Sequence, residues 1–264
     1  MNINLKSKYG AYALITGAAS GIGRAFAERL AQLGVCPILL DVNAQGAQAE
    51  AQRLREVYRV DARPLAVDLS APDFMREVQA AIAGLDVGLL VHAAVLSFIG
   101  EFLESPVERH RKLIDINIRA SMELARYFGE AFKNQKRGGL VLFSSASALQ
   151  GSALVQHYAA SKAYLLILAE GLWYELRPHG VDVLAVMPGS TDTPAIYEGS
   201  PDLRKAYIMQ PVEVVDESLA ALGRQPSVLC GAKNRLSFFF LTRILPRKLG
   251  VQIVSDRLMS MYRK

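Results

Sequence analysis

The chain has 264 residues and a mass of 28.8 kDa; 51% of its residues are hydrophobic and 21% are charged, which is enough apolar material for a full core and excludes a disordered chain. The net charge is +5, but residues 233–264 carry eight basic residues against one acid, so a general nucleic-acid-binding face is not indicated. Two cysteines, Cys36 and Cys230, form no disulfide framework, and the N-terminus has no signal-peptide pattern. We therefore expect a cytoplasmic protein.

The first informative segment covers residues 12–34. The apolar run 12–16 favours a β-strand, the sequence TGAASGIG at 16–23 favours a tight turn, and a helical pattern follows and ends at Gly34. This order is typical of a dinucleotide site. The glycines let the backbone approach a pyrophosphate, and the helix N-terminus supplies free N–H groups and a positive dipole end.

A second buried strand is predicted at residues 37–41 and ends in Asp41, eighteen residues after Gly23. A carboxylate at this place can bind the ribose hydroxyls of the adenosine half and repels a 2′-phosphate, so it favours NAD over NADP. Alternatively, Asp41 only caps the next helix.

The pattern then continues to alternate between the two element types. Helices are predicted at 44–58, 72–83, 106–132, 155–177 and 211–223, and strands at 63–68, 87–93, 140–144, 181–187 and 227–230. Such alternation predicts an α/β fold of one Rossmann-type domain over residues 1–232, with a doubly wound parallel sheet. Residues 233–264 are expected to form a helical C-terminal extension that is not an independent domain.

Tyr158 and Lys162 are four residues apart in a predicted helix and therefore share a face. A free tyrosine has a pKa of about 10, which a nearby cation lowers, so the pair could exchange protons nearer neutral pH. Ser145 follows the apolar strand 140–144 and would present its hydroxyl to the same place. The structural alternative is a half-buried ring beside a solvated charge.

These segments together resemble the short-chain dehydrogenase/reductase family. Residues 16–23 match its TGxxxGxG motif, residues 158–162 its YxxxK motif, and residues 188–193 its PGxxxT segment. Ser145 has the spacing of the family's serine, Asn117 is similar to the asparagine of its catalytic tetrad, and Asp68 falls where its acid contacts adenine. The matches cover residues 12 to about 195 in the family's order.

The resemblance implies an NAD(P)-dependent oxidoreductase that interconverts a carbonyl and a secondary alcohol. It implies that Tyr158 is the general acid or base and that Lys162 lowers its pKa and binds the nicotinamide ribose. It also implies that Ser145 holds the substrate oxygen and that Asn117 supports a proton relay through water. The cofactor-binding residues implied are Gly17, Ser20, Gly21, Ile22, Gly23, Asp41, Asp68, Ala93, Tyr158, Lys162, Pro188, Gly189, Thr191 and Thr193. The cofactor expected is NAD, with NADP as the less favoured choice.

One segment departs from the family. Where it has NNAG after the fourth strand, this chain has HAAV at residues 92–95, which could change cofactor affinity. His92 either replaces an asparagine as a hydrogen-bond donor or is an ordinary core histidine. His110, His157 and His179 have no metal-ligand spacing with the cysteines, and we predict no catalytic metal.

Ligands of such sheets lie beyond the carboxyl ends of the strands. The side chains there are apolar and predict a hydrophobic ketone or alcohol substrate; the candidate substrate-binding residues are Leu96, Phe98, Leu149, Val155, Ile196 and Tyr197. Arg204 and Lys205 could meet an anionic group on the substrate.

The C-terminal extension is apolar, basic and broken at Pro246, which does not suit a membrane-spanning helix. Three interpretations stay open: a lid over the pocket, peripheral membrane contact through residues 236–254, or an oligomer contact. The resemblance also implies a homodimer or homotetramer through the helices at 106–132 and 155–177. A dinucleotide-sensing protein without turnover and a 3-ketoacyl reductase are the alternative functions.

Overall fold

The computed structural model describes residues 5–197, 202–203 and 207–262. Its strands form one parallel sheet of seven strands in the order β3-β2-β1-β4-β5-β6-β7, which confirms the predicted Rossmann-type α/β fold. The strands are β1 (Tyr12–Thr16), β2 (Cys36–Asp41), β3 (Arg63–Ala66), β4 (Val87–His92), β5 (Gly138–Phe143), β6 (Val181–Met187) and β7 (Ser227–Leu229). The order reverses between β1 and β4, so the crevice at their carboxyl ends is where this type of sheet binds ligands.

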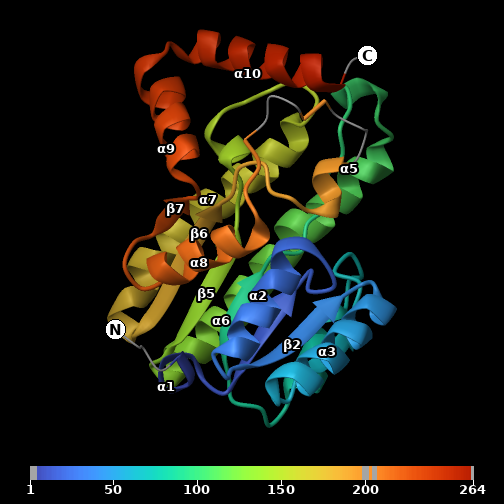
Figure 1. Ribbon diagram of the computed structural model, residues 1–264, viewed down its shortest axis with the longest axis vertical. Helices are drawn as coiled ribbons and strands as arrows, with labels where there is room; N and C mark the ends of the chain where they lie inside the picture. The colour runs from blue at the N-terminus through green and yellow to red at the C-terminus, as the bar shows by residue number, and fades with distance from the viewer. Residues whose placement is uncertain (1–4, 198–201, 204–206, 263–264) are drawn as a thin grey trace.

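Helices cover both faces of the sheet (Figure 1). Successive residues of a strand point to opposite faces, so Ala13 and Ile15 of β1 pack with one layer of helices and Leu14 packs with the other. The first layer contains α2 (Gly21–Gln32), α3 (Ala44–Tyr58) and α8 (Pro211–Ala221), and the second contains α4 (Phe74–Ile82), α6 (Ala120–Gln135) and α7 (Gln156–Leu176). This double cover explains why the strands are apolar without interruption.

The long helix predicted at 106–132 is broken. It consists of α5 (Val107–Ile114), a π-helical turn η2 (Asp115–Arg119) and α6. Such turns occur frequently at functional sites, and Asn117 lies at the centre of this one.

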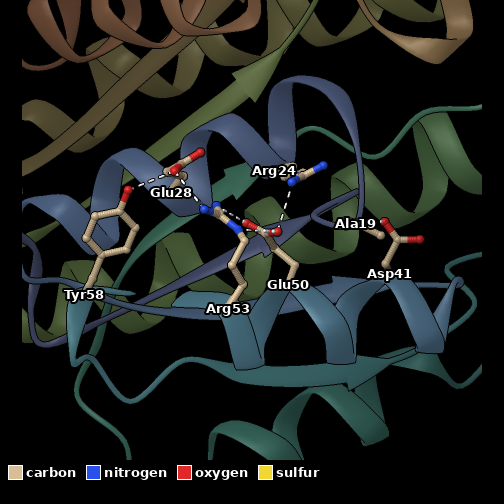
Figure 2. Close-up of polar contacts among 7 residues, drawn as sticks. All are labelled: Ala19, Arg24, Glu28, Asp41, Glu50, Arg53 and Tyr58. Atoms are coloured by element: carbon tan, nitrogen blue, oxygen red, sulfur yellow. Dashed lines mark hydrogen bonds and ion pairs between the residues drawn. The ribbon is translucent and has the colours of Figure 1, made fainter. Parts of the chain in front are cut away.

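An ion-pair network around the buried Glu50 joins α2 to α3 (Figure 2). Glu50 of α3 accepts from Arg24 Nε at 3.1 Å and from Arg53, and Arg53 also donates to Glu28 Oε1 at 3.0 Å. Glu50 is only 5% exposed, so this carboxylate is held by two guanidinium groups rather than by water. The network ties α3 to α2, and α3 begins three residues after Asp41, the last residue of β2.

The C-terminal extension folds against the body of the molecule, at the end opposite the N-terminal helix α1 (Leu5–Tyr9) (Figure 1). The sequence pattern did not predict helix α1. It consists of α9 (Ala232–Phe239), a π-helical turn η6 (Phe240–Ile244) and α10 (Arg247–Tyr262), with the predicted break at Pro246. Short 3-10 turns occur at η1 (Phe102–Glu104), η3 (Ala146–Leu149), η4 (Arg177–His179) and η5 (Pro194–Tyr197).

Two polar contacts hold α10 on the segment after β5. Arg247 donates to the carbonyl oxygen of Leu149 at 3.2 Å, and the Ala153 amide donates to Ser255 Oγ at 3.0 Å. Of the helices within the described ranges, none has the length and apolar content that crossing a membrane requires.

Candidate active site

The turn between β1 and α2 forms a cradle in which side chains have no room. A Cβ atom at Gly17 would come within 2.9 Å of the Ala94 backbone, and one at Gly23 would overlap the Gly17 carbonyl oxygen. Gly17 and Gly21 also have positive φ angles of 68° and 54°. Ser20, at the N-cap of α2, makes no capping bond with its side chain, so the first N–H groups of the helix remain available to an anion.

A cavity of about 320 Å³ opens beside this cradle at the carboxyl ends of β1, β2 and β4. Nine of the fourteen predicted cofactor residues line it: Gly17, Ser20, Gly21, Ile22, Gly23, Asp41, Asp68, Ala93 and Thr193. Leu40, Val42, Val67, Leu69, Ala94, Val95, Ile116, Pro194 and Ala195 complete the lining and were not predicted. A glycine cradle that ends in a free helix N-terminus, together with an acid at the rim, fits the pyrophosphate and ribose of a nicotinamide dinucleotide.

Asp41 lies at the rim of the cradle (Figure 2). Its Oδ2 accepts from the Ala19 amide at 2.9 Å and its Oδ1 accepts from the Asn43 amide at the same distance. The cap of α3 is Asn43, whose side chain accepts from the Gly46 amide at 3.0 Å. The alternative that Asp41 serves as the helix cap is therefore wrong for this chain.

Asp68 lies beyond the end of β3, in a loop rather than in the predicted strand. Hydrogen bonds from the hydroxyl and the amide of Ser70 lower the pKa of its carboxyl group, so Asp68 is held as an anion at the cavity rim.

The segment after β6 borders the same edge. Pro188 accepts from the Ala146 amide at 2.9 Å, Thr191 Oγ1 donates to the Gly189 carbonyl at 3.1 Å, and Thr193 packs against Gly21. Of the segment's predicted residues, Thr193 lines the cavity, whereas Pro188, Gly189 and Thr191 do not.

The hydroxyl group of Ser145 acts on that of Tyr158 and lowers the pKa of the phenol. Ser145 follows β5 as the N-cap of η3, and Tyr158 lies in the first turn of α7. Ser145 Oγ also accepts from the hydroxyl of Ser147 at 2.9 Å and from its amide at 3.2 Å. Because both lone pairs of Ser145 are used, its own proton can only be donated forward, toward Tyr158 or a substrate oxygen.

Burial, rather than the lysine, dominates the acidity of Tyr158. Burial raises the pKa of Tyr158, and the effect of the Ser145 hydroxyl offsets this only in part. Lys162 Nζ lies 5.7 Å from the centre of the Tyr158 ring and donates to the Phe143 carbonyl at 2.7 Å. Burial also lowers the pKa of Lys162 to about 7. The prediction that Lys162 lowers the pKa of Tyr158 is thus wrong for the chain alone, because low polarity disfavours both charged forms.

Asn117 uses its whole side chain as a clamp. Its Oδ1 accepts from the Leu96 amide at 2.8 Å, and its Nδ2 donates to the Leu96 carbonyl at 2.9 Å and to Ser161 Oγ at 3.0 Å. Ser161 in turn donates to the Tyr158 carbonyl. The clamp therefore joins the segment after β4 to the turn of α7 that carries Tyr158. The main-chain carbonyl of Asn117 accepts from Ser121 Oγ at 2.8 Å.

The predicted substrate residues have different surroundings. Leu96 is held by Asn117, and Leu149 and Val155 lie on either side of the segment under α10. Phe98 is buried against His110 and Arg109, and Tyr197 is 54% exposed and donates to Asp192. Ile196 is half-buried in η5, and none of the six lines the cofactor-side cavity. Arg204 and Lys205 lie outside the described residues.

Several site residues were missed because their signal is weak. Ser147 and Ser161 are serines without a family motif, and only the spacing of Ser147, two residues after Ser145, indicates a local hydroxyl turn. His110 and His157 lie together, with 2.8 Å between their Nδ1 atoms. Across the described ranges, His, Cys, Asp and Glu side chains do not gather in threes that could bind a metal ion.

The chain was compared with known protein families. The family model described as short chain dehydrogenase matches residues 11–203. A 7β-hydroxysteroid dehydrogenase from Collinsella aerofaciens is 31% identical over 238 residues, which cover 88% of this chain and 90% of that protein.

Solved structures show the same likeness. A structure of a 7β-hydroxysteroid dehydrogenase, studied for its stereoselectivity, superposes with a TM-score of 0.90 at 29% identity and covers 96% of this chain and 99% of its own. A short-chain dehydrogenase from Sphingobium yanoikuyae in complex with NADPH superposes with a TM-score of 0.77 at 29% identity and covers 86% of this chain and 91% of its own.

Proposed function

The chain belongs to the short-chain dehydrogenase/reductase family and is an oxidoreductase, and we propose that Tyr158 is the proton donor and acceptor of its reaction. The observation that carries this proposal is the buried phenol of Tyr158, on which the hydroxyl of Ser145 acts from the carboxyl end of β5. When bound, the nicotinamide dinucleotide supplies or accepts the hydride.

The protein then has to orient the substrate and move one proton. In carbonyl reduction, Tyr158 donates its phenolic proton to the substrate oxygen, and Ser145 donates a second hydrogen bond to the same oxygen. Burial keeps the phenol protonated at neutral pH, which is the form that reduction requires. In alcohol oxidation the same oxygen of Tyr158 takes the proton back, with Lys162 Nζ 5.7 Å from the centre of the ring.

We propose a hydrophobic polycyclic ketone or secondary alcohol of the steroid type as the substrate. The likeness to the 7β-hydroxysteroid dehydrogenase structure extends over 96% of the chain and so includes the C-terminal extension, which packs on the segment after β5. A screen of oxo- and hydroxysteroids, 3-oxoacyl thioesters and small ketones, followed by nicotinamide absorbance, tests the assignment. Turnover of the thioesters alone would identify a 3-ketoacyl reductase instead.

We propose NAD as the preferred cofactor. The Asp41 carboxylate at the cradle rim can bind ribose hydroxyls and repels a 2′-phosphate. Among the residues that the structure describes, no Lys or Arg side chain lines the cavity to neutralise such a phosphate.

We propose a homodimer through α7. Ile167 and Tyr174 are 68% and 73% exposed, and a Cβ atom at Gly171, between them on the same face, would meet no neighbour within 4 Å. Two apolar side chains around a flat position suit a self-complementary contact. Ile167→Glu should convert a dimer to a monomer in light scattering, whereas an unchanged mass would remove α7 from the interface.

Peripheral membrane contact is proposed for the outer side of the extension. Leu236, Phe239, Phe240 and Ile244 are more than half exposed, and Arg243 lies among them. Apolar side chains with adjacent positive charges favour an anionic lipid surface. Co-sedimentation with anionic liposomes at low salt is expected, and a protein that stays in the supernatant would refute this contact.

A further inference from the structure

His92 occupies the end of β4, where the family motif has its first asparagine, and it is buried with 1% exposure. Both ring nitrogens are bonded. Nδ1 lies 2.9 Å from Thr16 Oγ1, and Nε2 lies 2.7 Å from Ser121 Oγ. The ring therefore bridges the last residue of β1 and the first turn of α6.

The donor and acceptor of each hydrogen bond in this bridge follow from the Asn117 carbonyl, to which Ser121 is bonded. The Asn117 carbonyl can only accept, so the single proton of Ser121 is donated to it. Ser121 Oγ must then accept from His92, which places the proton of the ring on Nε2. Burial lowers the pKa of His92 to about 3, so the ring is neutral at physiological pH and Nδ1 accepts from the Thr16 hydroxyl. Thr16 Oγ1 accepts from the Ala94 amide at 3.0 Å.

The two ends of this chain of hydrogen bonds lie in the two halves of the site. Thr16 immediately precedes Gly17 in the cradle, and Ala94 both lines the cavity and packs against Gly17. At the other end is the main-chain carbonyl of Asn117, in the π-turn, and the side chain of the same residue bonds Leu96 and Ser161 beside Tyr158. A shift at either end would alter the orientation of the ring.

We propose that His92 is a positioning residue that couples the cofactor cradle to the Asn117 carbonyl through Thr16 and Ser121. His92 contacts neither the cofactor cradle nor the Asn117 carbonyl directly. It acts through the two hydroxyl groups that it orients. The inference rests on the proposed function only for its kinetic readout, because the tautomer of the ring and the affinity for NADH do not require turnover.

The first test is ¹⁵N nuclear magnetic resonance of histidine-labelled protein, with the His92 signals assigned from their loss in His92→Gln. We expect a neutral ring protonated at Nε2 from pH 8 down to about pH 5, since its pKa lies near 3. A ring protonated at Nδ1, or a cation at neutral pH, would overturn the proposed direction of the chain.

The second test is a double-mutant cycle of Thr16→Val and Ser121→Ala, which leave the histidine and the tetrad side chains in place. Each single change is expected to lower kcat about tenfold, the size of one lost hydrogen bond, and Ser121→Ala is also expected to weaken NADH binding, although Ser121 does not line the cavity. The double variant should lose about tenfold and not about a hundredfold, because either break releases the ring.

Ser218→Ala is the matched control. Ser218 is also buried and donates to the Val214 carbonyl four residues earlier in α8, as Ser121 of α6 does to the carbonyl of Asn117 in η2. It should change neither kcat nor NADH affinity. Independent losses in the double variant, or an NADH affinity unaffected by Ser121→Ala, would refute the coupling. If the protein turns over no tested substrate, the proposed function fails while the tautomer and the NADH affinity still decide this inference.

Discussion

The hydroxyl of Ser147 donates to Ser145 Oγ at 2.9 Å, and the Ser147 amide donates to the same atom at 3.2 Å. These two bonds fill the lone pairs of Ser145 and leave its proton for the substrate oxygen. Ser147→Ala should therefore lower kcat about tenfold with little change in KM, because one orienting hydrogen bond is lost. Ser147→Thr keeps the hydroxyl and should retain activity. Equal activity in the alanine and threonine variants would show that Ser147 does not orient Ser145.

The cradle makes a prediction about cofactor affinity. A Cβ atom at Gly23 would overlap the Gly17 carbonyl, so Gly23→Ala must displace the turn and should weaken NADH binding by at least about tenfold. Gly84→Ala is the control, since it strains a positive φ angle of 75° but meets no neighbour within 4 Å and is remote from the cavity. Fluorescence titration with NADH measures both. Similar affinities in the two variants would contradict the proposed pyrophosphate position.

Cofactor preference depends on one carboxylate. NADH should bind more tightly than NADPH, and Asp41→Asn should shift the ratio of the two affinities toward NADPH by about tenfold, because a charge repulsion is removed. Asp68→Asn is the control, because it also removes one negative charge from the cavity rim. The Asp68 carboxylate accepts from Ser70, and its loss should not shift this ratio. A wild-type preference for NADPH would refute the assignment of NAD.

Lys162 should reduce the stability of the folded chain. Burial lowers its pKa from 10.5 to about 7. Below pH 7 the lysine is charged in the folded chain, and the full free-energy cost of burying that charge reduces the stability. This penalty decreases as the pH rises from about 7 toward 10.5, because the folded chain then releases the proton that the unfolded chain retains.

Lys162→Met should therefore raise the melting temperature at pH 6 even though the bond to the Phe143 carbonyl is lost, and the gain should shrink at pH 9. Calorimetry at the two pH values tests this. A gain that does not depend on pH would mean that the lysine is not desolvated in the folded chain.

The sequence predicts some features of the fold and of the site but not others. The alternation of apolar strands with amphipathic helices determines the parallel sheet, and the glycines around Gly17 predict the cradle because backbone conformation is a local property. The π-turn at Asn117 could not be predicted, since it depends on how α5 and α6 pack on α7. The acidity of Tyr158 was predicted in the wrong direction because spacing along a helix contains no information on burial.

His92 shows the same limit. The departure from the family motif is visible in the sequence, but its consequence is set by the hydroxyl groups of Thr16 and Ser121, which come from β1 and α6. Such partners become neighbours only after the sheet has formed. Long-range polar contacts are therefore the part of the site that required the structure.

The central claim is that Tyr158 transfers the proton, and the most direct test is Tyr158→Phe. The change removes one hydroxyl from a buried ring, so the fold and NADH affinity should be retained, while turnover of any accepted steroid or ketone should fall below detection. Loss of NADH absorbance measures turnover, and fluorescence titration measures binding. Abolished turnover with unchanged NADH binding is the result predicted here; activity that survives in Tyr158→Phe would contradict the mechanism.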